Sequence, residues 1–308
     1  MGDDSIMKIA ITGGTGFVGR TLTSELVNDG HEIYILSRNI TNKKNEKQIT
    51  YVQWLNDGDH PESILEGIDS IINLAGESIN SGRWTEDRKK SILESRISAT
   101  NEILRIIASL KKKPQSLINA SAIGYYGISR TDTYTEDSNK MGDDFLARIV
   151  QKWETEAHKA ESLGCRTVYC RFGIILDKND GALPKIALPY KLFVGGTVGS
   201  GQQWLSWIHV KDVVHGIKFL LENENINGAV NFTAPYPVTM KDFGKKLASV
   251  LQRPHWIPAP GFALKIMLGE MSILVLEGQK VLPTKLMNSN YRFLFPDLKE
   301  ALVDIYHH

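Results

Sequence analysis

The chain has 308 residues, of which 42% are hydrophobic and 23% charged, a composition typical of a folded globular protein with one large domain or two smaller ones. Its net charge of +1 provides no electrostatic basis for binding nucleic acid or an anionic membrane, and no apolar run reaches the ~20 residues that a membrane-spanning helix needs. Because it has only two cysteines, Cys165 and Cys170, and no signal peptide, we expect a protein of the reducing cytoplasm.

Strand and helix patterns alternate through the first two-thirds of the chain. Short β-rich or apolar runs predict strands at residues 8–12, 32–36, 49–54, 70–76, 116–122 and 166–176. Apolar residues at helical spacing predict helices after the first strand, at 61–68, from Thr85 to about Leu110, and at 142–162. Near-continuous apolar strands separated by helices indicate a parallel sheet covered on both faces, so we expect an α/β fold.

The pattern changes after residue 177. The glycine- and proline-containing stretch 181–207 predicts an irregular segment over a cleft, and a helix, the short strand "AVNFT" and a helix capped by Thr239 and Asp242 follow. We therefore predict a main unit of residues 7–176 and 206–233, and a smaller, discontinuous substrate-binding unit of residues 177–205 and 234–308.

The first predicted strand runs into the glycine-rich stretch "KIAITGGTGFVGRTL". A glycine turn between a strand and an amphipathic helix is the context of a dinucleotide-binding site. Glycines allow the tight turn and the approach of backbone N–H groups to a pyrophosphate, and the helix N-terminus adds unpaired donors and partial positive charge. An ordinary glycine-rich turn is the alternative. The residues expected to contact the cofactor here are Gly13, Gly14, Thr15, Gly16, Phe17, Val18 and Gly19.

The end of the second strand, "ILSRN", predicts which dinucleotide binds. A carboxylate there would bond the ribose 2′-hydroxyl of NAD, but this chain has Ser37 and Arg38 instead. Because an arginine can pair bidentately with a phosphate, we predict NADP(H) as the cofactor and the main unit as an NADP-binding domain. The alternative for Arg38 is a solvated surface cation.

Further motifs resemble the extended short-chain dehydrogenase/reductase superfamily. They are "GGTGFVG", "NLAG" (73–76), the serine after the fifth strand and "WIHVKD" (207–212). More closely, "RWTEDRKKSILESR", "SAIGYYG", "GSGQQWLSWIHV" and "LEGQKVLPTKL" resemble an atypical subfamily named NAD(P)-dependent or sugar-nucleotide epimerases, with a C-terminal epimerase-associated domain. This resemblance covers residues 7 to 303. It implies a Rossmann-type doubly wound parallel sheet, further cofactor contacts at Leu74, Ala75 and Gly76, and an oxidoreductase or epimerase activity.

The resemblance breaks at the residues that usually perform acid–base chemistry. Typical superfamily members use a tyrosine four residues before a lysine, whose charge lowers the tyrosine pKa from about 10. No tyrosine of this chain has a lysine at that spacing, and Leu146 and Val150 align with the two positions. Tyr126 and Arg130 have the nominal spacing, but "YGISRTD" predicts a turn rather than a helix. Tyr125 and Tyr126 are alternatively aromatic walls of the nicotinamide pocket.

Two other polar residues are candidates for catalysis beside Tyr126. Ser121 keeps the serine position of the superfamily and would hydrogen-bond a substrate carbonyl or alkoxide, unless it is a satisfied strand-end hydroxyl. Arg96 stands where extended members carry an asparagine that faces the active site, so it would hold a cofactor phosphate or stabilise an oxyanion. The alternative for Arg96 is a salt bridge with a neighbouring glutamate, such as Glu94 or Glu102.

The region before "IHV" bears on the substrate. Leu205 aligns with the arginine that grips the diphosphate in sugar-nucleotide epimerases, which counts against a nucleotide sugar. Trp204 and Trp207 would stack on a flat or apolar substrate, or else pack under the cleft. His209 and Asp212 begin a helix, and we interpret both as structural.

The predicted function is therefore an NADP-dependent oxidoreductase or epimerase that acts on a small molecule without the usual Tyr-x-x-x-Lys pair. A non-catalytic NADP(H)-binding redox sensor or scaffold is the alternative. No cluster of His, Cys and carboxylates has metal-ligand spacing, so no metal is expected. The resemblance implies a homodimer through the helices at 85–110 and 142–162.

Overall fold

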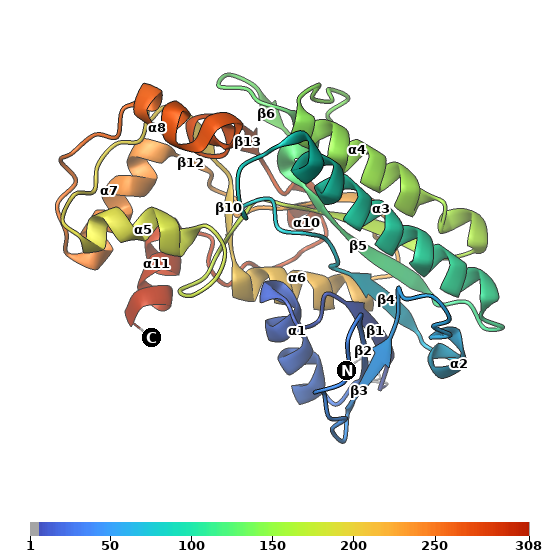
Figure 1. The fold of residues 1–308 in the computed structure, drawn as a ribbon. Helices are drawn as coiled ribbons and strands as arrows, with labels where there is room; N and C mark the ends of the chain where they lie inside the picture. Colours follow the sequence, from blue (N-terminus) through green and yellow to red (C-terminus); the bar gives the residue numbers. More distant parts are fainter. Residues whose placement is uncertain (1–5, 308) are drawn as a thin grey trace.

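The computed structural model describes residues 6–307, so the predicted domain boundary at 308 lies outside the described residues. Its centre is a seven-stranded parallel sheet of order β11-β7-β5-β4-β1-β2-β3, in which the chain starts near the middle and winds outward in both directions (Figure 1). The strands are β1 (Lys8–Thr12), β2 (Glu32–Ser37), β3 (Ile49–Gln53), β4 (Ser70–Asn73), β5 (Ser116–Ala122), β7 (Arg166–Phe172) and β11 (Gly228–Phe232). The predicted α/β doubly wound sheet is confirmed.

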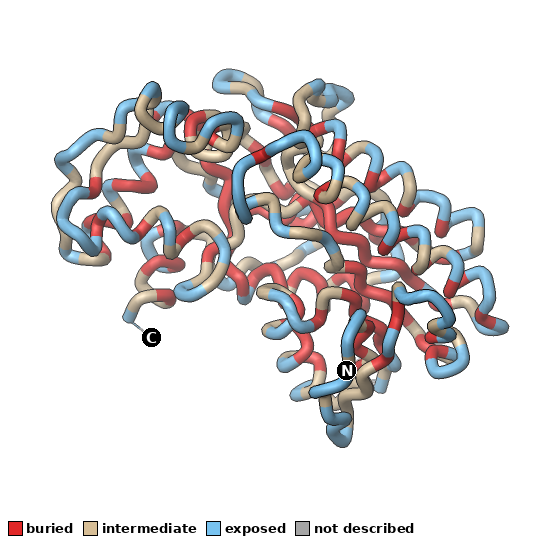
Figure 2. Tube along the Cα trace, viewed as in Figure 1, coloured by how far each residue is buried: buried red, intermediate tan, exposed pale blue. Residues whose placement is uncertain are grey.

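Helices cover both faces of this sheet. Helices α1 (Phe17–Asn28) and α6 (Val210–Glu222) lie on one face, and α3 (Glu86–Ser109) and α4 (Phe145–His158) lie on the other (Figure 1). The strands are therefore buried on both sides, as Figure 2 shows along the middle of the molecule. Burying an isoleucine or leucine side chain contributes about 1.5–3 kcal/mol, which explains why the strands read as continuous apolar runs.

Two strand predictions were too long. The predicted strand 166–176 breaks at Gly173, where a Cβ atom would lie 2.5 Å from the carbonyl oxygen of Ser206. After this break, β8 (Ile174–Leu176) leaves the main sheet and pairs with β10 (Trp207–His209). The predicted strand 70–76 ends at Asn73 in the structure. The helix predicted at 142–162 is also shorter in the structure, where it begins at Phe145 and ends at His158.

The prediction of an irregular segment at 181–207 was partly wrong, because helix α5 (Leu183–Lys191) forms within it. Pro184 lies in the first turn, where its missing N–H costs nothing. Pro189 removes only one internal hydrogen bond, since the helix ends two residues later. The predicted cap at Thr239 is confirmed: its Oγ1 accepts a hydrogen bond from the backbone N–H of Asp242 at 3.2 Å, at the start of α7 (Met240–Leu251).

The remaining elements are short, apart from the last helix. They are α2 (Glu62–Leu65), β6 (Thr133–Tyr134), β9 (Trp204–Leu205), β12 (Val238–Thr239), α8 (Gly261–Leu268), α9 (Ile273–Leu276), β13 (Lys280–Val281), α10 (Thr284–Asn288) and α11 (Leu298–His307). Strand β13 pairs with β6, and β12 pairs with β9. No helix within residues 6–307 is both long and apolar enough to cross a membrane.

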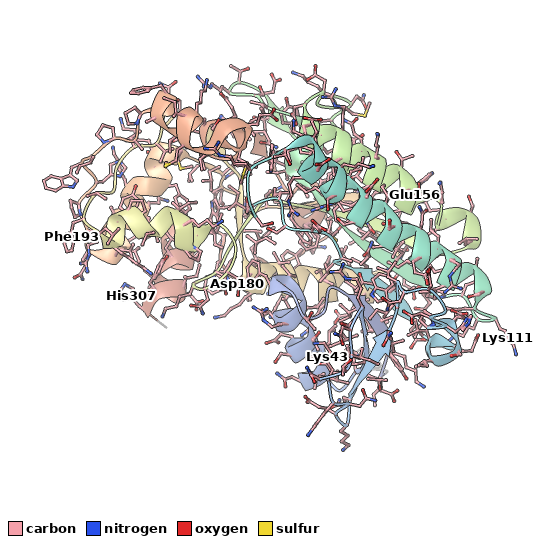
Figure 3. The ribbon with its side chains drawn as sticks, viewed as in Figure 1. Lys43, Lys111, Glu156, Asp180, Phe193 and His307 are labelled. Atoms are coloured by element: carbon pink, nitrogen blue, oxygen red, sulfur yellow. The ribbon has the colours of Figure 1, made fainter. Side chains whose placement is uncertain are left out.

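A second hydrophobic core lies beside the sheet. It is formed by α5, α7, α11 and strand β10, with Tyr190, Trp207, Phe243 and Leu302 buried in it. Asp180, at the connection between the two parts (Figure 3), accepts a hydrogen bond from the Arg20 guanidinium of α1 at 2.9 Å. A separate core is what a smaller unit needs, while the exact division of the chain into 7–176 with 206–233 and 177–205 with 234–308 stays a prediction.

Candidate functional site

The glycine turn after β1 has the geometry of an anion-binding loop. Gly13 adopts φ +68°, and a Cβ atom there would lie 2.7 Å from the carbonyl oxygen of Leu74. A Cβ atom at Gly19 would lie 2.2 Å from the carbonyl oxygen of Gly13, so only glycine lets α1 pack this closely on the turn. Helix α1 begins after Gly16 without a side-chain cap, which leaves its first backbone N–H groups available to a ligand.

Ser37 and Arg38 lie next to this turn. Strands β1 and β2 are parallel with Thr12 opposite Leu36, so the residues that follow both strands emerge at the same edge of the sheet. Ser37 Oγ donates a hydrogen bond to the carbonyl of Asn39 at 3.0 Å. Arg38 is exposed, and no salt bridge to its guanidinium forms within residues 6–307. Its charge is therefore available to an anion.

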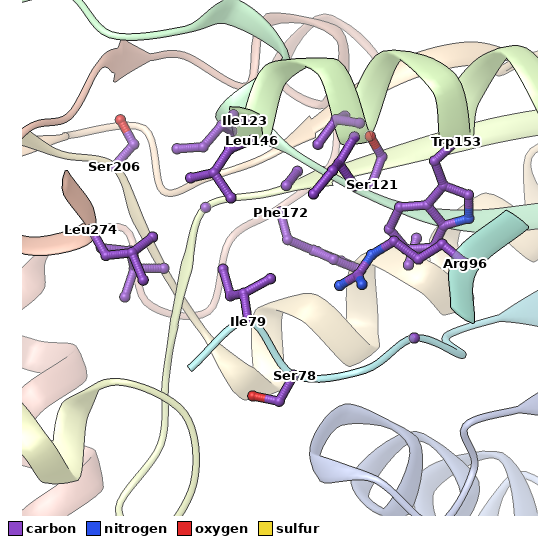
Figure 4. Close-up of a pocket in the computed structure, with 18 of the residues that line it drawn as sticks. Ser78, Ile79, Arg96, Ser121, Ile123, Leu146, Trp153, Phe172, Ser206 and Leu274 are labelled. Atoms are coloured by element: carbon purple, nitrogen blue, oxygen red, sulfur yellow. The ribbon is translucent and has the colours of Figure 1, made fainter. Parts of the chain in front are cut away.

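A cavity of about 630 Å³ opens from the glycine turn. Ten of the predicted site residues line it, while Gly14, Thr15, Ser37, Arg38 and Tyr126 do not. The ten are Gly13, Gly16, Phe17, Val18, Gly19, Leu74, Ala75, Gly76, Arg96 and Ser121. The structure thus brings the predicted cofactor loop, the predicted catalytic cation and the predicted catalytic serine to one cavity (Figure 4).

Arg96 projects from α3 into this cavity, beside Trp153 of α4 (Figure 4). Its Nη1 donates to the backbone carbonyls of Glu77 at 3.1 Å and Ile92 at 2.8 Å, and its guanidinium lies 5.1 Å from the ring centroid of Trp153. Within residues 6–307, neither Glu94 nor Glu102 pairs with it, so the salt-bridge alternative does not hold in this structure. Burial lowers the pKa of Arg96 to about 10, which leaves it charged at neutral pH.

Ser121 belongs to a buried hydrogen-bond chain. Its Oγ donates to Glu154 Oε1 at 2.5 Å, and Glu154 is held by two bonds from Arg171, from Nε at 2.8 Å and from Nη2 at 2.7 Å. The Ser121 side chain is 3% exposed, and Figure 4 shows its hydroxyl directed toward α4. Because its proton is donated to Glu154, only its lone pairs remain for a ligand.

Tyr126 lies away from the cavity. Its hydroxyl donates to Asn231 Oδ1 at 2.8 Å, its ring stacks on Tyr134, and it is 1% exposed. Burial raises the pKa of Tyr126 above its usual value, opposite to what a general base needs. Arg130, its nominal partner, pairs instead with Glu277 at 3.5 Å.

The positions of the missing Tyr–Lys pair face the cavity. Leu146 and Val150 both line it from α4, followed one turn later by Trp153. Trp153 Nε1 donates to Thr100 Oγ1 at 3.1 Å, which fixes the indole beside Arg96. The face of α4 that usually carries acid–base residues therefore presents apolar side chains here.

The residues around "QQWLSW" divide into one that lines the cavity and others that are buried away from it. Trp204 lines the cavity, whereas Leu205 and Trp207 are buried in the second core. His209 caps α6 by accepting from the backbone N–H of Lys211 at 3.1 Å, and the Asp212 carboxylate accepts from two backbone N–H groups of the 294–295 segment. His209 and Asp212 are thus structural, as predicted.

Several lining residues were not predicted. Ile79 follows the "NLAG" stretch, Ile123 follows Ser121, and Ile273, Leu274 and Glu277 come from the distant C-terminal segment. Glu154 and Arg171 were also missed, although a glutamate on the buried face of a helix and an arginine inside an apolar strand are signals of a buried ion pair.

Comparison with known proteins identifies the family. The sequence model of the NAD dependent epimerase/dehydratase family matches residues 9–232. The chain belongs to this family. A second model, described as a domain of unknown function (DUF1731), matches residues 259–305, so this epimerase/dehydratase family member carries the C-terminal domain that the resemblance implied.

Relatives of this epimerase/dehydratase family member match over nearly their whole length. The epimerase family protein YfhF of Bacillus subtilis is 53% identical and is aligned over 96% of this chain and 97% of its own. An epimerase family protein of Staphylococcus aureus is 43% identical over the same shares. The crystal structure of human epimerase family protein SDR39U1 (isoform 2) with NADPH is 32% identical, with a TM-score of 0.87 over 98% of this chain and 100% of the human one.

Proposed function

We propose that this chain is an NADP(H)-dependent oxidoreductase or epimerase that acts on a small molecule without the usual Tyr-x-x-x-Lys pair. One observation carries the proposal: the glycine turn at the start of α1 and the Arg96 guanidinium open onto the same cavity. Bound NADP(H) would supply or accept the hydride, and the protein would supply binding, orientation and charge.

The residues of the first two strand ends fit a phosphorylated dinucleotide. The turn at Gly13–Gly19 offers close backbone approach and free N–H groups for a pyrophosphate. Arg38 offers an exposed guanidinium for a 2′-phosphate, where a carboxylate would repel it. The relative SDR39U1, whose structure contains NADPH, supports the same choice.

Arg96 would stabilise negative charge on the substrate oxygen. Its remaining N–H groups are held in place by the two carbonyl bonds of Nη1, so little reorganisation is needed when charge develops. In the direction of reduction, the substrate carbonyl would take up the hydride at carbon and a proton from water at oxygen, and Arg96 would pair with that oxygen as it gains negative charge. Ser121 would accept a hydrogen bond from a substrate hydroxyl, since its own proton is donated to Glu154.

The first prediction concerns Arg38. Titration of the protein with NADPH and NADH in a calorimeter should show tighter binding of NADPH. Arg38→Ala should weaken NADPH binding by about 10- to 100-fold, the loss of one charge-assisted contact of about 1.5–3 kcal/mol, and leave NADH binding nearly unchanged.

Arg292→Ala is the matched control, because Arg292 is also an exposed arginine but belongs to the segment after α10 rather than to the ends of β1 and β2. It should change neither affinity. If the wild-type protein takes up neither nucleotide, or if Arg38→Ala weakens both equally, the assignment of the cofactor is wrong.

A second candidate function is a non-catalytic NADP(H)-binding redox sensor, favoured by the apolar Leu146 and Val150 on the usual catalytic face of α4. A sensor must discriminate NADPH from NADP⁺, since a ligand shifts a conformational equilibrium only through differential affinity. Equal affinities for the two forms, together with turnover of any carbonyl compound or alcohol, would exclude it.

A further inference from the structure

The cavity has a second end, opposite the glycine turn, whose walls are hydrocarbon. Its side chains come from four separate parts of the chain and face one another across the space (Figure 4). We call it the apolar end, defined by Ile79, Ile123, Leu146, Ile149, Ile273 and Leu274. An apolar wall of this kind gains free energy by covering hydrocarbon and none by covering hydroxyl groups.

Polar groups near the apolar end already have partners within the protein. Ser206 Oγ donates to the carbonyl of Gln279 and accepts from a backbone N–H, both at 2.9 Å. Gln279 Nε2 donates to the carbonyl of Ile123 at 2.9 Å. The hydroxyl groups of a sugar ring placed here would lose their hydrogen bonds to water. Few protein groups are free to replace those bonds, and each unpaired hydroxyl would cost about 1–3 kcal/mol.

Two further polar side chains of the lining, Trp204 and Glu277, are also engaged. Trp204 Nε1 donates to the carbonyl of Arg130 at 3.0 Å, and Glu277 pairs with the Arg130 guanidinium at 3.5 Å. What Trp204 offers the cavity is therefore the face or edge of its ring rather than a donor.

One cation lines the cavity within residues 6–307, namely Arg96. A guanidinium has five N–H groups, and the hydrogen bonds of Arg96 use only the two on Nη1. The three others can hold one oxygen function, but a diphosphate would need more positive charge. Leu205 cannot supply it, because it is apolar and buried in the second core.

We propose that the substrate is a small apolar molecule with a single carbonyl or hydroxyl oxygen, not a nucleotide sugar. This inference rests on the proposed function, because it places the cofactor at the glycine turn and the substrate at the apolar end. The oxygen faces Arg96, and the hydrocarbon part contacts Ile79, Leu146 and Leu274.

The test uses the full chain saturated with NADPH, with acetophenone and cyclohexanone as apolar probes and UDP-glucose as the nucleotide sugar. Binding is followed by calorimetry and by the fluorescence of bound NADPH, and oxidation of NADPH is followed by absorbance. We expect the apolar ketones to bind and UDP-glucose not to bind. Tighter binding of UDP-glucose, or no binding of either ketone to NADPH-loaded protein, overturns the inference.

A substitution in the apolar end tests whether the ketone binds there. Leu274→Asp places a carboxylate in the apolar end and should weaken acetophenone binding by about tenfold or more, with NADPH affinity unchanged. Leu188→Asp, the same exchange at a side chain that is 54% exposed on α5, is the control and should change neither affinity. Ile79→Asn, across the cavity, provides a second variant if Leu274→Asp does not fold.

The two proposals fail in different ways. If NADPH itself does not bind, the proposed function is wrong. If NADPH binds with the Arg38 dependence described above but UDP-glucose is the preferred ligand, only the inference about the substrate is wrong.

Discussion

Glu154 is the residue on which the serine side of the cavity depends. It joins Ser121 of β5 to Arg171 of β7, and the Glu154 and Arg171 side chains are only 9% and 6% exposed. The Arg171 guanidinium also lies 3.5 Å from the ring centroid of Tyr125. A buried ion pair of this kind contributes little net stability while it is intact, but removing one partner leaves a buried charge without compensation.

We therefore predict that Glu154→Gln lowers the free energy of unfolding by about 3–5 kcal/mol, because the Arg171 charge stays buried and loses its carboxylate. Urea denaturation followed by tryptophan fluorescence measures this change. In a double-mutant cycle, Glu154→Gln combined with Arg171→Met should cost less than the sum of the two single changes.

The control is Glu94→Gln on the neighbouring helix α3. Glu94 pairs with Lys90 at the surface, with side chains 60% and 72% exposed, so its removal should cost less than about 1 kcal/mol. Equal costs for the buried and the exposed glutamate would show that the Glu154–Arg171 pair is not buried.

Among the elements, α6 and α11 meet at His209. This side chain caps α6, is 2% exposed, and has its Nε2 3.2 Å from Asp304 Oδ2 of α11. The charges of Lys211 and Asp177 also act on it, and the ring of Phe295 lies 4.2 Å away between centroids. Burial lowers the pKa of His209 to about 4, against a smaller opposing effect of Asp304.

This shift predicts how stability depends on pH. Between pH 4 and pH 6.5 the unfolded chain binds a proton at this position and the folded chain does not, so stability is fully present above pH 6.5 and falls as the pH approaches 4. The full effect is roughly 3 kcal/mol at 1.36 kcal/mol per pKa unit.

His209→Asn tests this assignment, since asparagine can still cap the helix but does not titrate. Urea unfolding at a series of pH values should give a smaller loss of stability on acidification for the variant than for the wild type. Identical pH profiles for the two proteins would mean that His209 is not the titrating group.

At the scale of the whole molecule, the C-terminal segment forms one wall of the cavity and the sheet forms the other. Lys89 of α3 pairs with Glu270 at 2.6 Å, and Arg83 donates to the carbonyl of Met267 at 3.3 Å. Beneath these contacts, Ile273 and Leu274 pack against the cluster that holds Trp84 and Ile149. The cavity therefore exists only when both parts of the chain are folded and docked.

NADPH should accordingly stabilise the folded chain as a whole. At a free concentration 100 times the dissociation constant, the expected gain is about 2.7 kcal/mol in the free energy of unfolding. Urea unfolding with and without NADPH measures it. At the same NADPH concentration, Arg38→Ala should show a much smaller gain, and a stability that does not respond to NADPH in the wild type would contradict specific binding to the folded state.

The sequence by itself determined the doubly wound sheet, the glycine turn, the cation after the second strand and the absence of the Tyr–Lys pair. Most of these features are local, because an apolar run, a glycine turn or a strand end is defined by residues within a few positions of one another. The order of the strands is not local, and it was predicted from the resemblance to the superfamily. Arg96 was predicted through the resemblance, which implied that its helix position faces the active site.

Only the tertiary structure decided what surrounds these residues. The carbonyl of Ser206 leaves no room for a Cβ atom at Gly173, Glu154 bonds a serine 33 positions away, and Leu274 reaches the cavity from the C-terminal segment. Tyr126 and Ser121 are close in sequence, yet one hydroxyl bonds Asn231 and the other Glu154. Such contacts depend on how separate elements dock, and periodicity along the chain carries no information about them.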